Sequence, residues 1–107
     1  MPEILYTVRA TCKDVRQRGR FLSWLTPDHV LMVKAGGATA VRIVLPDRAN
    51  DSAAACVETQ YVFPSRKVFD TYVRDHAPAT RADALKHFPP ESGVTLERQV
   101  AEIATEL

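Results

Sequence analysis

CVETQYVF, from Cys56 to Phe63, has the two-residue alternation of a β-strand. One side of this strand is apolar or aromatic at most positions, namely Val57, Thr59, Tyr61 and Phe63. The other side is mixed and carries Glu58, Gln60 and Val62. A strand of this kind needs an apolar cover on one side and a different environment on the other.

Three further segments have strand character: Glu3–Thr11, Ala40–Leu45 and Val94–Ile103. Two helical regions and a long polar connection lie between them. In the first helical region, Phe21 to Leu25 holds apolar residues at helical spacing. Thr26-Pro27 predicts a break into two pieces, and Gly36-Gly37 predicts the end of the second piece.

The second helical region should begin after Ser65, whose hydroxyl can accept a hydrogen bond from a free amide of the first turn. Its apolar face comprises Val68, Phe69, Tyr72, Val73 and His76. Pro78 predicts a break or kink just after His76. A helix then resumes over 79–88, with Ala82, Leu85 and Phe88 expected to face inward.

The element order is strand, helix, strand, strand, helix, strand, which is the βαββαβ order of an α+β ferredoxin-like fold. We expect residues 1–107 to form a single domain with one four-stranded antiparallel sheet. Right-handed crossovers place both helical regions on one face of this sheet, with the second and fourth strands at its edges. Cys12 and Cys56 should then lie close together on neighbouring strands without forming a disulfide.

The face without helices needs a partner, because a two-layer domain buries a sheet side only where something lies against it. Alternation assigns Arg9, Arg42, Glu58 and Gln60 to this face, together with several apolar residues. A mixed surface with opposite charges suits the sheet of a second subunit better than bulk water. We therefore expect a homodimer with these four residues in its interface.

The composition of the chain limits the classes of function that it can have. The 107 residues are 46% apolar and carry a net charge of +1, which favours neither nucleic acid nor a membrane surface as partner. The sequence has no signal-peptide pattern and no apolar run of membrane-spanning length. Two cysteines and three histidines show no metal-ligand spacing. We expect a cytoplasmic protein with free thiols, no metal and no cofactor.

Four motifs resemble those of a small, uncharacterised bacterial family, a domain of unknown function. They are WLTPDHV at residues 24–30, GGA at 36–38, VETQYVFPS at 57–65 and FDTYVRDHAPATRADALKHF at 69–88. The family is similar to the dimeric α/β-barrel superfamily, in which two ferredoxin-like subunits press their sheets together. That superfamily includes cofactor-free monooxygenases, haem-degrading enzymes, lactone isomerases and proteins with no known reaction, so the resemblance implies fold rather than activity.

Four residues are candidates for a pocket between sheet and helices: Trp24, His29, Tyr61 and His76. For Trp24, core packing is favoured over pocket lining. His29 either contacts a ligand or bonds a nearby backbone group, and the resemblance places a histidine at this position. His76 is either a proton carrier or a helix-terminal group that bonds exposed carbonyls. Asp83 and His87 are spaced to form a solvated surface pair.

Three functions remain open. The protein is a homodimer that binds a small, partly apolar molecule; a cofactor-free monooxygenase-like or isomerase-like enzyme with His29 or His76 as acid or base; or a structural or regulatory dimer without a pocket. A cavity holding a histidine with a hydrogen-bonded orienting partner would favour the enzyme. A filled interior would favour the structural dimer.

Overall fold

The computed structural model describes residues 2–47 and 55–107. Its four strands are β1 (Ile4–Cys12), β2 (Ala40–Val44), β3 (Ala55–Phe63) and β4 (Thr95–Glu102). They form one antiparallel sheet in the order β2-β3-β1-β4, which confirms the ferredoxin-like prediction. Most of the polar connection expected between β2 and β3 lies outside the described residues.

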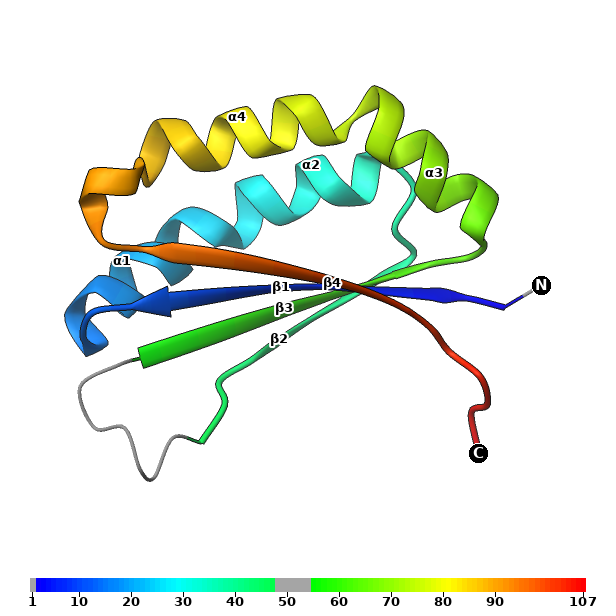
Figure 1. Cartoon of the computed structure of the whole chain (residues 1–107), viewed down its shortest axis with the longest axis horizontal. Helices are drawn as coiled ribbons and strands as arrows, with labels where there is room; N and C mark the ends of the chain where they lie inside the picture. The colour runs from blue at the N-terminus through cyan, green and yellow to red at the C-terminus, as the bar shows by residue number, and fades with distance from the viewer. Residues whose placement is uncertain (1, 48–54) are drawn as a thin grey trace.

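All the helices lie on one side of the sheet (Figure 1). The first helical region consists of α1 (Val15–Trp24), the π-helical turn η1 (Leu25–His29) and α2 (Val30–Ala35). The second consists of α3 (Arg66–Asp75) and α4 (Ala77–His87), and the short 3-10 turn η2 (Pro90–Ser92) leads into β4. Of the helices in the described residues, none is both long enough and apolar enough to cross a lipid bilayer.

Side chains cap the N-termini of two of these helices. The Asp14 carboxylate accepts a hydrogen bond from the Gln17 amide at 2.8 Å at the start of α1. Ser65 Oγ accepts one from the Val68 amide at 3.2 Å at the start of α3, as predicted. Each such cap is worth about 1 kcal/mol, because it satisfies a donor that the helix leaves free.

The predicted break near Thr26 is confirmed. Thr26 has extended backbone angles, φ −120° and ψ 127°, inside an otherwise helical segment. The peptide bond from Thr26 to Pro27 is cis. The second piece ends at Gly36-Gly37, where Gly37 adopts a φ of 122° that favours glycine.

The inward face of the last helix differs from the prediction. Ala82 is exposed, Leu85 is 57% exposed, and Phe88 is only half-buried. The buried residues of α4 are Ala77, Thr80 and Ala84. The helix begins at Ala77 with Pro78 in its first turn, and its buried positions follow steps of three and four residues from Ala77, a series that leaves out Ala82 and Leu85.

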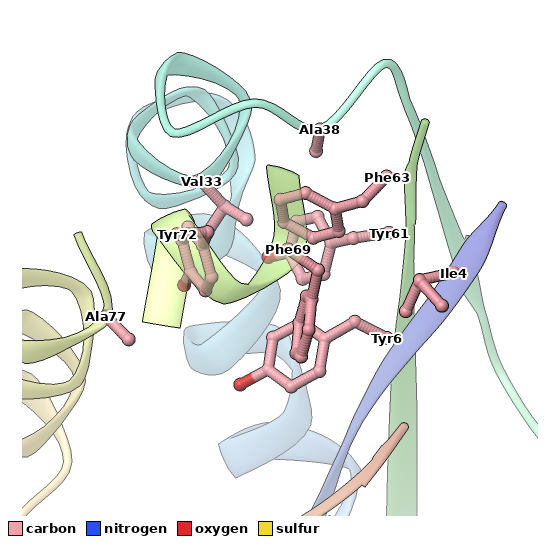
Figure 2. Packing of buried hydrophobic residues seen from close by; sticks show 9 residues of the cluster. All are labelled: Ile4, Tyr6, Val33, Ala38, Tyr61, Phe63, Phe69, Tyr72 and Ala77. Carbon is pink, nitrogen blue, oxygen red and sulfur yellow. The ribbon is translucent and has the colours of Figure 1, made fainter. Parts of the chain in front are cut away.

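An aromatic cluster fills the space between the sheet and the second helical region (Figure 2). Tyr6 on β1 and Tyr61 on β3 are paired in register and stack with their ring centroids 5.9 Å apart. Phe69 and Tyr72 of α3 pack on the ring of Tyr6, at 5.3 and 6.0 Å. The apolar side assigned to β3 from alternation is therefore the side that faces the helices.

The opposite face of the sheet carries a continuous polar network. Arg42 on β2 donates two hydrogen bonds to Gln60 Oε1 on β3, at 2.9 and 2.7 Å. Gln60 Nε2 donates to Glu58 at 3.4 Å, and Glu58 accepts from Arg9 Nε on β1 at 3.0 Å. The hydrogen bond from Arg9 lowers the pKa of the Glu58 carboxyl. All four residues assigned to this face from alternation lie on it.

The two cysteines are neighbours, as predicted. Thr11 pairs with Cys56 and Cys12 pairs with Ala55 across the ladder between β1 and β3. Both thiols are buried and reduced. Because the two residues occupy alternate positions, their side chains point to opposite faces of the sheet, and a disulfide between them is sterically impossible.

Candidate functional site

A cavity lies between the sheet and the helices, where both helical regions meet β1, β3 and β4. Its free space is ≈ 410 Å³ with the open mouth included, but only ≈ 30 Å³ is wide enough for the centre of a water molecule. The wall includes Trp24, His29 and Tyr61, which come from three different elements. The structure thus brings together three of the four residues singled out in the sequence.

His29 is the titratable residue at the centre of this site. It ends η1, just before α2, and its side chain is 11% exposed. Its Nδ1 atom lies 2.9 Å from Oδ2 of Asp83 on α4. An ionised carboxylate only accepts hydrogen bonds, so Nδ1 carries the proton and the lone pair of the ring resides on Nε2. A carboxylate therefore orients this imidazole, an arrangement that a general base requires.

Trp24 fixes the plane of this imidazole. The two ring centroids lie 4.2 Å apart with an angle of 33° between the planes. Phe21 and Phe88 pack on other parts of the indole, at 5.2 and 5.4 Å. Trp24 is thus both part of the apolar packing and part of the cavity wall.

Burial lowers the pKa of His29 below its ordinary value of 6.5. The hydrogen bond and the charge of Asp83 act in the opposite direction but are the smaller influences. The neutral imidazole is therefore the dominant form at neutral pH. A base in this state accepts a proton without first losing one.

Asp83 holds a second histidine as well. His87 follows one turn later on α4, and its Nδ1 lies 3.4 Å from Oδ1 of Asp83. This ring is 45% exposed, so the predicted surface pair exists at the solvent side of the carboxylate. The other oxygen of the same carboxylate bonds the buried His29, which links the surface of α4 to the cavity wall.

Residues with hydroxyl groups also line the cavity, among them Tyr61, Tyr72 and Thr80. The Tyr72 hydroxyl lies 2.8 Å from Thr80 Oγ1, and Thr80 Oγ1 donates to the Ala77 carbonyl at 3.1 Å. Since threonine has one hydroxyl proton, Tyr72 donates to Thr80 and keeps its own oxygen as an acceptor. Burial raises the pKa of Tyr61, so this phenol stays protonated at neutral pH.

His76 is placed differently from the other three candidates. It forms the junction between α3 and α4 and is absent from the cavity wall. Its ring lies parallel to that of Tyr72, with 3° between the planes and centroids 6.3 Å apart. Its backbone carbonyl accepts from the amides of Ala79 and Thr80, at 3.1 and 3.2 Å. These contacts are those of a helix-junction residue.

The carboxylate that orients His29 was missed by sequence reasoning, since Asp83 lies 54 residues away. Arg81 and Arg98, which also line the cavity, were missed for the same reason. In the part of the chain that the structure describes, no three histidine, cysteine, aspartate or glutamate side chains gather as metal ligands would.

The sequence matches no protein-family model and no curated protein sequence. Solved structures do match over the full chain. One is a dimeric ferredoxin-like protein from an uncultured marine organism, 14% identical over 100% of both chains, with a TM-score of 0.69. Another is a putative antibiotic biosynthesis monooxygenase from Bacillus cereus, 7% identical over 100% of this chain and 98% of the other, also with a TM-score of 0.69.

A third is SnoaB, a cofactor-independent oxygenase from Streptomyces nogalater, with 13% identity, a TM-score of 0.65 and coverage of 100% of this chain and 98% of that protein. The fold is ferredoxin-like. At these identities the likeness establishes architecture, and the chemistry has to be argued from the site itself.

Proposed function

We propose that this protein binds a small, partly apolar organic molecule at the cavity and moves a proton on it with His29. The observation that carries the proposal is the 2.9 Å contact between Asp83 and Nδ1 of a buried histidine in the cavity wall. A histidine oriented in this way supplies what general-base catalysis requires, namely a fixed ring, a defined tautomer and a lone pair. Trp24 and Tyr61 supply the apolar part of the site.

The similar structures support this chemistry by their names alone. One is a cofactor-independent oxygenase and another a putative monooxygenase. Two features favour a small molecule over nucleic acid as the ligand, the enclosed cavity and the net charge of +1. A bacterial, cytoplasmic setting is part of the proposal, and the bacterial sources of two similar structures support its bacterial part.

The small size of the cavity favours a second candidate function, that of a structural dimer. The cavity has room for about one water molecule, ≈ 30 Å³, so the interior of the domain is almost filled. A nearly filled interior is what we expect of a structural dimer without a pocket. The two candidates differ in a measurable way, because a structural dimer gains no stability from small molecules.

The test is a thermal-shift screen of a metabolite library, followed by proton exchange. Compounds that raise the melting temperature are incubated in D₂O with wild type, His29→Ala and His76→Ala, and loss of C–H signals is followed by NMR. Wild type and His76→Ala should catalyse exchange at similar rates, while His29→Ala should be at least about 100-fold slower.

Each contrary outcome identifies another function. Compounds that bind without exchange would make the protein a binding module. Exchange that survives in His29→Ala would place the base elsewhere. If no compound of the library raises the melting temperature, the structural dimer is the remaining candidate function.

The homodimer is a proposal of the same kind, supported by the mixed sheet face and by the dimeric marine protein of similar fold. We expect sedimentation equilibrium to give twice the chain mass of 11.9 kDa. Glu58→Arg should shift the protein toward monomer, because it places a third cation between Arg9 and Arg42. Lys67→Glu, a charge change on the exposed side of α3, is the control. A monomeric wild type would contradict the proposal.

A further inference from the structure

Two arginines stand where the cavity opens toward the surface. Arg81 lies on α4, one turn after Ala77, and Arg98 lies on β4 opposite Val8 of β1. Both line the inner cavity, and both also line an outer groove between α4 and β4. Both arginines therefore lie where the groove and the cavity adjoin, within reach of a molecule that occupies both.

The outer groove is apolar on its remaining sides. Its walls include Leu85, Phe88, Val94 and Leu96. The part of the groove that is wide enough for the centre of a water molecule measures ≈ 310 Å³, about ten times the ≈ 30 Å³ of the inner cavity. A volume of this size accommodates a small aromatic ring system, whereas the inner cavity does not. The exposure of Leu85, which the sequence predicted to face inward, is explained if its side chain forms one wall of a binding groove.

The two arginines lack the carboxylate partners that other arginines of this chain have. Arg9 is paired with Glu58, and Arg74 is paired with Asp75 at 2.9 Å. Within residues 2–47 and 55–107, neither Arg81 nor Arg98 has an ion-pair partner, and no aspartate or glutamate lines the cavity or the groove.

Both guanidinium charges act on the site. The charge of Arg98 lowers the pKa of His29, and the charges of Arg81 and Arg98 both oppose the rise in the pKa of Tyr72. Two unpaired cations from different elements therefore create a positive potential at the junction of cavity and groove. A planar guanidinium can donate two parallel hydrogen bonds to the two oxygens of a carboxylate. The two arginines therefore match a carboxylate in both charge and geometry.

We infer that the ligand is an aromatic carboxylate, with its ring in the α4–β4 groove and its carboxylate between Arg81 and Arg98. This placement brings the atoms next to the carboxylate toward the cavity that His29 lines. The inference rests on the proposed function for the role of His29, but not for the binding of the anion. It names the class of substrate on which the base acts.

A matched pair of probes tests the inference. 2-Naphthoate and 2-naphthamide have nearly the same shape and differ in charge, so their binding is compared by ¹H–¹⁵N NMR titration of the full chain. Wild type should bind the acid at least about tenfold more tightly than the amide. The amide signals of Leu85, Phe88 and Leu96 should shift.

Arg98→Gln and Arg81→Gln should each lose most of this preference while still binding the neutral amide. Arg74→Gln, on the exposed side of α3, is the matched control and should behave as wild type. Equal affinity for acid and amide in wild type would overturn the inference. So would an absence of binding at millimolar concentration, or a preference that survives in both groove variants.

Failure of the inference and failure of the proposed function can be told apart. Arginine-dependent binding of the acid, with no exchange that depends on His29, would leave an anion-binding module without catalysis. Exchange that depends on His29 but occurs only on neutral compounds would retain the catalyst and remove the carboxylate from its substrate.

Discussion

The two helix junctions of this protein each hold a histidine, yet the two side chains have different surroundings. His29 ends the π-helical turn between α1 and α2, and His76 joins α3 to α4. His29 bonds a carboxylate from another helix and lines the cavity, whereas His76 stacks on Tyr72 within its own helical region. Both junctions look alike in sequence, with a proline two residues before one histidine and two residues after the other.

The difference shows that the role of a histidine at a helix break is set by what packs against it. At the first junction α4 supplies Asp83, and Trp24 supplies an aromatic surface. At the second junction α2 ends against the histidine, where Gly36 approaches the rings of Tyr72 and His76. The histidine of the first junction therefore has a polar partner from another helix, and the histidine of the second has a packing contact.

The largest effect should come from filling the space at the second junction. A Cβ atom added to Gly36 would lie 2.6 Å from Tyr72 Cδ1 and 3.0 Å from His76 Cγ. We expect Gly36→Ala to lower the free energy of unfolding by about 1–3 kcal/mol, because the well-packed rings must move. Urea unfolding measures this change.

Gly19→Ala is the matched control. Gly19 lies within α1, and a Cβ atom there would meet nothing within 4 Å. This variant should be more stable than wild type by up to about 1 kcal/mol, since alanine favours a helix interior over glycine. A Gly36→Ala protein as stable as wild type would show that the second junction is not tightly packed.

A smaller effect should appear in the pH dependence of stability. The pKa of His29 is below 6.5 in the folded protein, so the unfolded chain binds more protons between the two values. Stability should therefore rise as pH increases toward and through 6.5, and level off above it. His29→Gln should lack this contribution, while His76→Gln should retain it.

Urea midpoints measured from about pH 5 to pH 8 check this prediction, because the window covers the usual range of histidine titration. Asp83→Asn provides a further comparison. Removing the carboxylate should lower the pKa of His29 still further, because Asp83 is the group that raises it. A His29→Gln variant whose pH profile equals that of wild type would contradict the assignment.

The fold could be predicted because its signals are local. Alternation in β3 and in Glu3–Thr11 identifies the faces of the sheet, and Thr26-Pro27 and Gly36-Gly37 mark helix boundaries within a few residues of the chain. The open face could be assigned for the same reason, since Arg9 and Glu58 follow from the two-residue period of their strands.

The site could be predicted only in part, because its contacts join distant segments. Trp24, His29 and Tyr61 were identified as candidates, but nothing local links His29 to an aspartate 54 residues away. The break after His76 was predicted correctly, but the inward face of α4 was not, because Ala82 and Leu85 were expected to face the core and the buried residues are Ala77, Thr80 and Ala84. Arg81 joins Thr80 and Ala84 in lining the cavity.

The most direct test of the account is the protonation state of His29, observed by ¹⁵N NMR of the imidazole rings as a function of pH. We expect His29 to be neutral at pH 7, with the proton on Nδ1, and to titrate below 6.5. A proton on Nε2, or a titration midpoint above 6.5, would contradict the claim that Asp83 and burial make this histidine a base.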